Sequence, residues 1–133
     1  MSEIGAIPQD LKYSKEHEWV REQGDEVEVG ITAFAANALG DVVFVELPKV
    51  GSRLVAGKPF GVVESVKSVS DLFTPVTGQV TAVNATLEES PELVNEAPYA
   101  GGWMIRIQPD RSDEAIQLLS ATDYQTLLQG AAH

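Results

Sequence analysis

The 133-residue chain contains no cysteine, which excludes disulfides, thiolate nucleophiles, iron–sulfur clusters and cysteine-bound zinc. It has two histidines, His17 and His133, and neither lies in a pattern typical of a catalytic triad. A G-x-S-x-G elbow, a Walker A loop and a G-x-G-x-x-G fingerprint are also missing from the sequence. We therefore expect a protein that is not an enzyme in its own right and has no metal site.

Basic residues are scarce, with 9 Lys and Arg against 20 Asp and Glu and a formal net charge of −11. Such a chain repels nucleic acids and anionic lipids and favours partners with basic docking surfaces. Apolar runs are far shorter than the ~20 residues that cross a bilayer, and the first residues resemble neither a secretory signal nor a transit peptide. These features predict a cytoplasmic protein that forms one domain over residues 1–133.

Short β-branched and aromatic stretches, cut by turn residues, predict a mainly β fold of antiparallel strands over residues 18–82. Gly24 and Asp25 supply a first hairpin turn, and the nearly continuous apolar stretch at 42–47 predicts a strand in the core. A short helix is expected at 33–39, because Thr32 suits its N-cap and Gly40 its C-terminal end.

The second half of the chain predicts a long pair of strands at about 60–83 and one further strand within 102–109. Pro, Gly and acidic residues predict an ordered loop at 88–102. The tail, about 112–130, predicts two short amphipathic helices whose apolar residues face inward: Ile116 and Leu119 from the first, and Tyr124, Leu127 and Leu128 from the second.

Lys67 differs from the other four lysines because it lies inside an otherwise apolar pair of strands. The flanking sequence is nearly mirror-symmetric, which predicts a tight turn at Lys67-Ser68 that pairs Val66 with Val69. Two interpretations fit this pattern. Lys67 is either an ordinary exposed turn lysine that protects a sheet edge, or an amine that a modifying enzyme acylates to make the domain a carrier of a reactive group.

Four segments together resemble one known family, the H proteins of the glycine cleavage system. In order they are LKYSKEHEWV, VGITAFAANALGDVVFVELPKVG, VESVKSVSDLFTPVTGQVTAVN and PELVNEAPYAGGWMIRI. The resemblance extends from Leu11 to about Tyr124. It implies a hammerhead-like flattened β barrel or sandwich of the lipoyl and biotinyl type, with lipoic acid in amide linkage to Lys67.

The resemblance also implies partners and a function. The P protein, a glycine decarboxylase, loads an aminomethyl group onto the lipoyl arm, and the T protein, an aminomethyltransferase, takes the one-carbon unit. The L protein, dihydrolipoyl dehydrogenase, reoxidises the arm, and a lipoate ligase or lipoyl transferase attaches it. A protein that must leave each enzyme in turn is expected to be a monomer.

Residues similar to the family's arm cleft are Glu16, Ser70 and Asp71, where a carboxylate would hold the cationic amine. Two positions depart from the family: Ser68 replaces a common alanine, and Phe73 replaces a frequent tyrosine and lacks its hydroxyl. The role of His17 stays open at this point.

Three alternatives remain. The first is a lipoyl domain of a 2-oxoacid dehydrogenase or a biotin carrier, although these are shorter and usually read D-K-A or M-K-M around the lysine. The second is a lipoyl relay that donates lipoyl groups to other enzymes. The third is an interaction module whose Lys67 is never modified.

Overall fold

The computed structural model describes residues 7–110 and 118–131. His133 and most of the first predicted tail helix therefore lie outside the described residues. The elements are, in chain order, β1 (Lys12–Tyr13), β2 (Glu18–Gln23), β3 (Glu26–Ile31), α1 (Ala33–Leu39), β4 (Val42–Glu46), β5 (Arg53–Leu54), β6 (Pro59–Ser65), β7 (Val69–Phe73), β8 (Gly78–Val83), α2 (Thr86–Glu89), α3 (Leu93–Glu96), β9 (Ile105–Pro109) and α4 (Ala121–Ala131).

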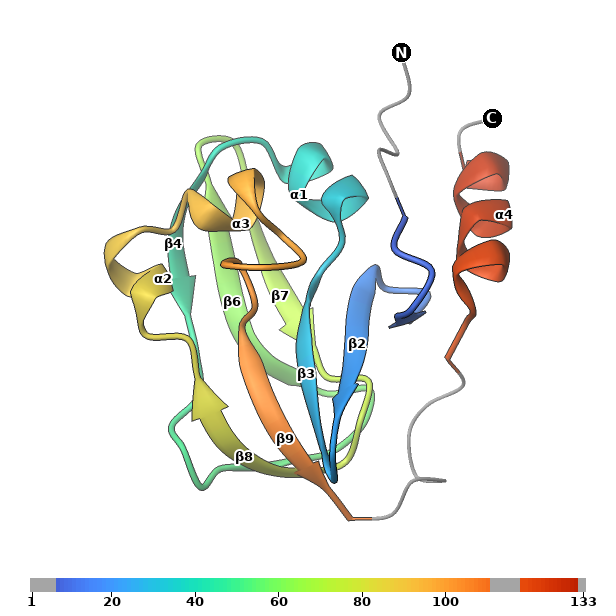
Figure 1. The fold of residues 1–133 in the computed structure, drawn as a ribbon. Coiled ribbons are helices and arrows are strands. Elements are labelled where there is room, and N and C mark those ends of the chain that lie inside the picture. The colour runs from blue at the N-terminus through green and yellow to red at the C-terminus, as the bar shows by residue number, and fades with distance from the viewer. Residues whose placement is uncertain (1–6, 111–117, 132–133) are drawn as a thin grey trace.

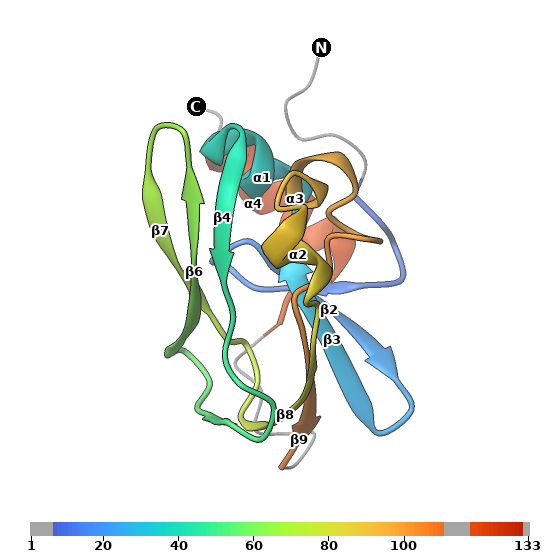
Figure 2. The same ribbon diagram turned by 90° about the vertical axis from the view of Figure 1, so that its left-hand side faces the viewer.

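The strands form two antiparallel sheets that lie face to face (Figure 2). One sheet has the order β1-β2-β3-β9-β8-β5, and the other has the order β4-β6-β7. Apolar side chains from both sheets fill the space between them, including Val29 and Ile107 from the larger sheet and Val63 and Leu72 from the smaller one. The predicted mainly β fold is confirmed as a flattened sandwich, and the two sheets do not close into a barrel.

Helix α1 confirms the expected short helix and its capping. The Thr32 hydroxyl oxygen accepts a hydrogen bond from the Ala35 N–H, and Gly40 ends the helix at a φ of 83°, a conformation that favours glycine. Asn95 then fixes the chain beyond the helix. Its Nδ2 donates to the Gly40 carbonyl at 2.8 Å, and its Oδ1 accepts from the Val42 N–H at 2.8 Å. The Asn95 side chain therefore fixes the connection between α1 and β4.

The prediction that residues 42–47 form a core strand is only half right. Val42 and Val45 are buried, but Val43 is 51% exposed and Phe44 is 47% exposed. β4 is an edge strand of the three-stranded sheet, and its pairing with β6 shifts register between Val42 and Phe44. A run of apolar residues therefore does not mean burial on both faces here.

Two further expectations need correction. The segment 88–102 is not wholly loop, since α2 and α3 each supply one helical turn at 86–89 and 93–96. Leu119 does not belong to a helix, because it forms an isolated antiparallel bridge with Tyr13. The second tail helix is confirmed as α4, with Tyr124 and Leu128 buried.

Helix α4 and the N-terminal segment make a second, smaller core beside β2 (Figure 1). The Tyr124 ring stacks on Tyr13, with centroids 4.6 Å apart. Trp19 is completely buried in this cluster, and a Cβ on Gly30 would lie only 2.6 Å from its indole. Among residues 7–110 and 118–131, no helix has the length and apolar character to cross a bilayer.

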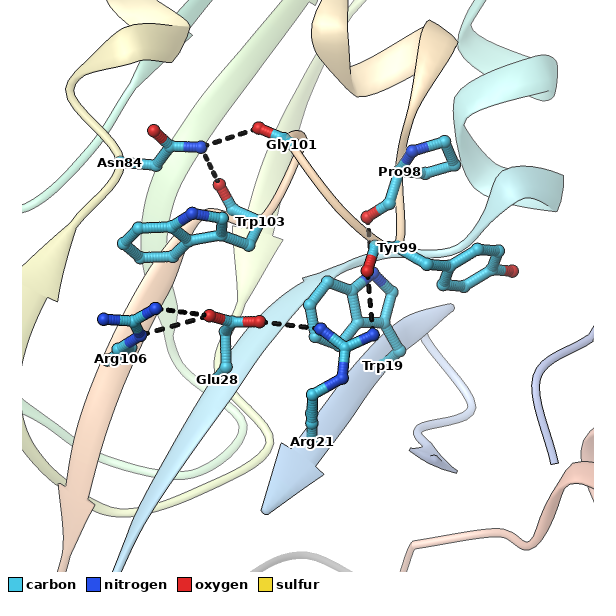
Figure 3. Close-up of polar contacts among 9 residues, drawn as sticks. All are labelled: Trp19, Arg21, Glu28, Asn84, Pro98, Tyr99, Gly101, Trp103 and Arg106. Atoms are coloured by element: carbon cyan, nitrogen blue, oxygen red, sulfur yellow. Dashed lines mark hydrogen bonds and ion pairs between the residues drawn. The ribbon is translucent and has the colours of Figure 1, made fainter. Parts of the chain in front are cut away.

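A buried carboxylate ties three adjacent strands of the larger sheet together (Figure 3). Glu28 on β3 pairs with Arg21 on β2 at 2.8 Å and with Arg106 on β9 at 3.0 Å. The two guanidinium groups lie over the Trp19 and Trp103 rings, at 4.8 and 4.5 Å from the ring centroids. Each guanidinium therefore gains a cation–π contact as well as an ion pair.

The segment that follows α3 is fastened to the same sheet by side chains (Figure 3). Three residues bind its carbonyl groups: Trp19 donates to Pro98, Arg21 donates to Tyr99, and Asn84 donates to both Gly101 and Trp103. Because these bonds replace a regular ladder, an irregular chain path is held in one place.

Candidate functional site

Lys67 lies at the tip of the β6–β7 hairpin, which rises beside α1 (Figure 1). The Ser65 N–H donates to the Ser68 carbonyl at 2.8 Å, so Val66 and Lys67 form the turn. The Ser65 hydroxyl oxygen accepts from the backbone N–H groups of Lys67 and Ser68. The Val66 N–H donates to the Asp41 carbonyl at 3.0 Å. The tip is therefore braced within the hairpin and against the end of α1.

The predicted turn is wrong by one residue. β6 and β7 pair Glu64 with Val69, and the turn is Val66-Lys67 instead of Lys67-Ser68. Val66 and Val69 consequently do not face each other, and both are about two-thirds exposed, at 69% and 65%. The serine side chain decides this register, because Ser65 supplies an acceptor for the turn's own N–H groups.

The Lys67 side chain is exposed and its stem runs over Gly40. Lys67 Cε lies 3.4 Å from the place that a Cβ on Gly40 would occupy. Within the described parts of the chain, the Lys67 amine makes no ion pair. It is therefore available to a reagent or an enzyme from outside.

A cleft of about 560 Å³ lies between the two sheets next to this hairpin. Glu16, in the turn before β2, and Ser70 and Asp71, on β7, all line it although they are far apart in sequence. Lys67 does not line the cleft, but its neighbour Ser68 does. The remaining walls are largely apolar and include Ile31, Phe34, Ala35, Ala38, Leu39, Val63, Leu72 and Phe73.

The cleft thus combines apolar walls with carboxylates. Glu16 and Asp71 are exposed, and Ser70 is half-buried. This composition suits a slender apolar ligand with a cationic end. Phe73 lines the cleft and, without the tyrosine hydroxyl, its side chain adds no hydrogen-bonding group to the wall.

Glu18 is a cleft residue that the sequence analysis missed. Its side chain lines the same cleft, yet the residue is only 3% exposed. The Ser14 hydroxyl donates to Glu18 Oε1 at 2.5 Å. Burial raises the pKa of Glu18 to about 7, and hydrogen bonds from Ser14 and the Phe73 backbone oppose this rise only in part. Strand periodicity could have revealed it, because Glu18 and Val20 share one face of β2.

The raised pKa of Glu18 predicts a pH-dependent cost to stability. The unfolded carboxyl keeps its ordinary pKa of 4.5, so the folded chain binds more protons between about pH 4.5 and 7 and becomes less stable as pH rises. Glu18→Gln removes this titration. Its free energy of unfolding relative to the parent should rise by about 2 kcal/mol between pH 5.5 and 8.5, as measured by denaturant titration.

The matched control is Glu16→Gln, which neutralises an exposed carboxylate in the same cleft. It leaves Glu18 in place, so this variant should keep the parent's fall in the free energy of unfolding between the two pH values. A parallel pH dependence in the Glu18→Gln variant and the parent would contradict the burial of an ionisable Glu18.

The fold and the site together define a small β sandwich that presents a lysine on a braced hairpin beside a partly acidic cleft. A family model described as "Glycine cleavage H-protein" matches residues 11–131. The glycine cleavage system H protein of Magnetococcus marinus is 58% identical over 124 residues, which cover 93% of this chain and 89% of that protein. That of Anoxybacillus flavithermus is 54% identical over 123 residues, covering 92% and 97%.

A solved structure agrees with these sequence matches. The crystal structure of a glycine cleavage system H protein from Mycobacterium marinum superposes with a TM-score of 0.87 and 41% identity. The match covers 92% of this chain and 99% of that chain. The chain belongs to the glycine cleavage H-protein family.

Proposed function

We propose that this chain is the lipoyl-bearing shuttle of the glycine cleavage system, with lipoic acid in amide linkage to Lys67. It carries the aminomethyl group derived from glycine from the P protein to the T protein, and the L protein reoxidises it. It acts as a non-catalytic subunit. The observation that supports this most strongly is the exposed Lys67 amine on a braced hairpin tip, directly beside a cleft that suits an apolar arm.

The tip suits attachment of lipoate for a physical reason. Acylation removes the lysine charge, and no described acidic side chain pairs with that charge. Modification therefore breaks no ion pair with the described residues. When bound, the lipoyl group supplies a disulfide that can be reduced and a sulfur that carries the one-carbon cargo.

The cleft would protect that cargo. Its apolar walls exclude water, which would otherwise hydrolyse the loaded arm. The carboxylates bind the cationic amine of the cargo, and Ser70 and Asp71 add hydrogen bonds at the β7 wall. We assign the stronger contact to Glu18 and the weaker to Glu16, because a charge interacts more strongly where solvent is excluded.

The partners follow from this role. They are the P, T and L proteins and the lipoate ligase or lipoyl transferase that modifies Lys67. We infer that the chain works as a cytoplasmic monomer and that residues 1–133 form one carrier domain, because a shuttle must dissociate from each enzyme in turn.

Reconstitution tests this function directly. The chain is lipoylated with a purified lipoate ligase and mixed with the P, T and L proteins, glycine, tetrahydrofolate and NAD. The lipoylated chain should support glycine-dependent NADH formation, and the unmodified chain should support none. A lipoylated chain that donates its lipoyl group to other enzymes but gives no NADH would instead favour the lipoyl relay.

A further inference from the structure

His17 lines the cleft in an unusual backbone conformation. Its φ is 71°, in the left-handed region of backbone conformation that residues other than glycine rarely adopt. The backbone is held there from both sides, since the His17 N–H donates to the Ser14 carbonyl and the His17 carbonyl accepts from the Thr32 N–H. Such a conformation persists only when its surroundings impose it.

The His17 ring is clamped by two aromatic residues from other elements. Phe34 of α1 lies 4.9 Å away between centroids, and Tyr124 of α4 approaches edge-on at 5.7 Å. His17 Nδ1 lies 2.9 Å from the Tyr124 hydroxyl, which lies 2.8 Å from the Thr32 hydroxyl. The turn before β2, the N-cap of α1 and helix α4 thus meet in one series of hydrogen bonds.

Which group donates in each of these two hydrogen bonds follows from the protons available. Thr32 is completely buried, and its oxygen already accepts from the Ala35 N–H. The buried Thr32 proton needs an acceptor, and the Tyr124 oxygen is the one partner of this hydroxyl among the described residues that can accept it. With Thr32 donating, the single Tyr124 proton goes to His17 Nδ1. Burial lowers the pKa of His17 from its ordinary value of 6.5, so the ring is neutral above about pH 6.5. With Nδ1 accepting from Tyr124, the one proton of the neutral ring is on Nε2.

Nε2 is the ring nitrogen left for a ligand. It makes no hydrogen bond with the described residues, and it is not among their buried atoms without a partner. His17 thus adds an N–H donor to a cleft whose charged side chains, Glu16, Glu18 and Asp71, are carboxyl groups that accept hydrogen bonds when ionised. A donor cannot bind the cationic end of a ligand, so it requires an acceptor elsewhere on that ligand.

We propose that His17 donates Nε2–H to a sulfur of the docked arm, and that Tyr124 is the positioning residue that fixes this tautomer. The identity of the ligand rests on the proposed function, since the acceptors at the far end of a lipoyl arm are its sulfurs. Carboxylates and imidazole then divide the work: the former bind the amine of the cargo, and the latter binds the sulfur next to it. Through Tyr124, the docking of α4 supports the cleft.

Nitrogen-15 NMR of the imidazole tests both parts on the full chain. In the unmodified protein, the two ring nitrogens should show the pattern of a neutral Nε2–H tautomer. In the lipoylated protein loaded from glycine by the P protein, solvent exchange of the Nε2 proton should slow at least tenfold. An Nδ1–H tautomer, or an exchange rate unchanged by loading, would overturn the proposal.

Two variants separate positioning from structure. Tyr124→Phe keeps the stacked ring but removes the hydroxyl, so His17 should become a mixture of tautomers and most of the slowing should disappear. Tyr99→Phe removes a hydroxyl that accepts from the Ala33 N–H near the same helix, and it should behave like the parent. Equal effects of the two variants would contradict the positioning role of Tyr124. If Tyr124→Phe fails to fold, the tautomer and the exchange rate measured in the parent still test the role of His17.

The failure of this inference is distinguishable from the failure of the proposed function. Intact mass, measured before any spectrum, shows whether Lys67 accepts lipoate and cargo. A chain that never accepts lipoate overturns both. A chain that loads normally but leaves Nε2–H exchange unchanged overturns the role of His17 alone.

Discussion

Lys67→Arg should fold like the parent chain, carry no lipoate and give no glycine cleavage in the reconstituted system. The substitution is at an exposed turn, so its effect on the free energy of unfolding should be below about 0.5 kcal/mol. The guanidinium keeps the positive charge but stays protonated and cannot form the amide. The expected loss of activity is therefore complete and is not caused by unfolding, which intact mass and thermal unfolding check together.

Lys58→Arg is the matched control. Lys58 is also exposed and lies immediately before β6, at the opposite end of the β6–β7 hairpin from Lys67. This variant should be lipoylated and active like the parent. Residual glycine cleavage in Lys67→Arg would contradict the assignment of the carrier lysine. Loss of lipoylation in Lys58→Arg would point to Lys58 as the lipoylation site instead.

The second large effect is expected at Glu18. Glu18→Gln preserves shape but removes the buried carboxyl, whose ionised form would bind the cargo amine, so above pH 7 the loaded arm should lose its cargo to water about ten times faster. Glu16→Gln changes an exposed carboxylate, where solvent screens the interaction, and should have a smaller effect. The measurement follows the mass of loaded protein over time after removal of the P protein.

The comparison of Glu18→Gln with Glu16→Gln shows which carboxyl group contacts the cargo amine. A larger effect at Glu16 would mean that the arm stays near the rim of the cleft. Equal rates in the parent and both variants would contradict protection of the cargo by carboxylates. Because Glu18→Gln also removes a titrating group, the rates are compared at a pH where both variants are folded.

The sequence was sufficient to predict the elements whose boundaries depend on adjacent residues. Thr32 and Gly40 predicted both ends of α1, and the Gly24-Asp25 turn follows directly from the residues between β2 and β3. The Lys67 turn was predicted one residue too late. The reason is that apolar symmetry suggested the pairing, while the Ser65 side chain determines it through hydrogen bonds.

The errors arose where burial depends on neighbours in space. Val43 and Phe44 were expected in the core, but β4 is an edge strand with one face open to solvent. Leu119 carried a helical pattern, but it pairs with Tyr13 near the other end of the chain. Neither the sheet order nor a pairing across more than 100 residues is encoded in a local period.

The candidate site could be predicted from the sequence only in part. Glu16, Ser70 and Asp71 line one cleft, and their part in binding an arm stays a prediction of the family resemblance. Glu18 was overlooked because a charged residue between His17 and Trp19 looks like part of a solvated segment. The contact between His17 and Tyr124 joins residues 107 positions apart, and no spacing rule reaches that far.

The most direct test of the central claim is the intact mass of the protein isolated from its native host with lipoate available, followed by peptide mapping. The account predicts one lipoyl adduct, located on Lys67. An unmodified Lys67 that a purified lipoate ligase also fails to modify would contradict the account. A biotin mass, or a lipoyl adduct on another lysine, would contradict it equally.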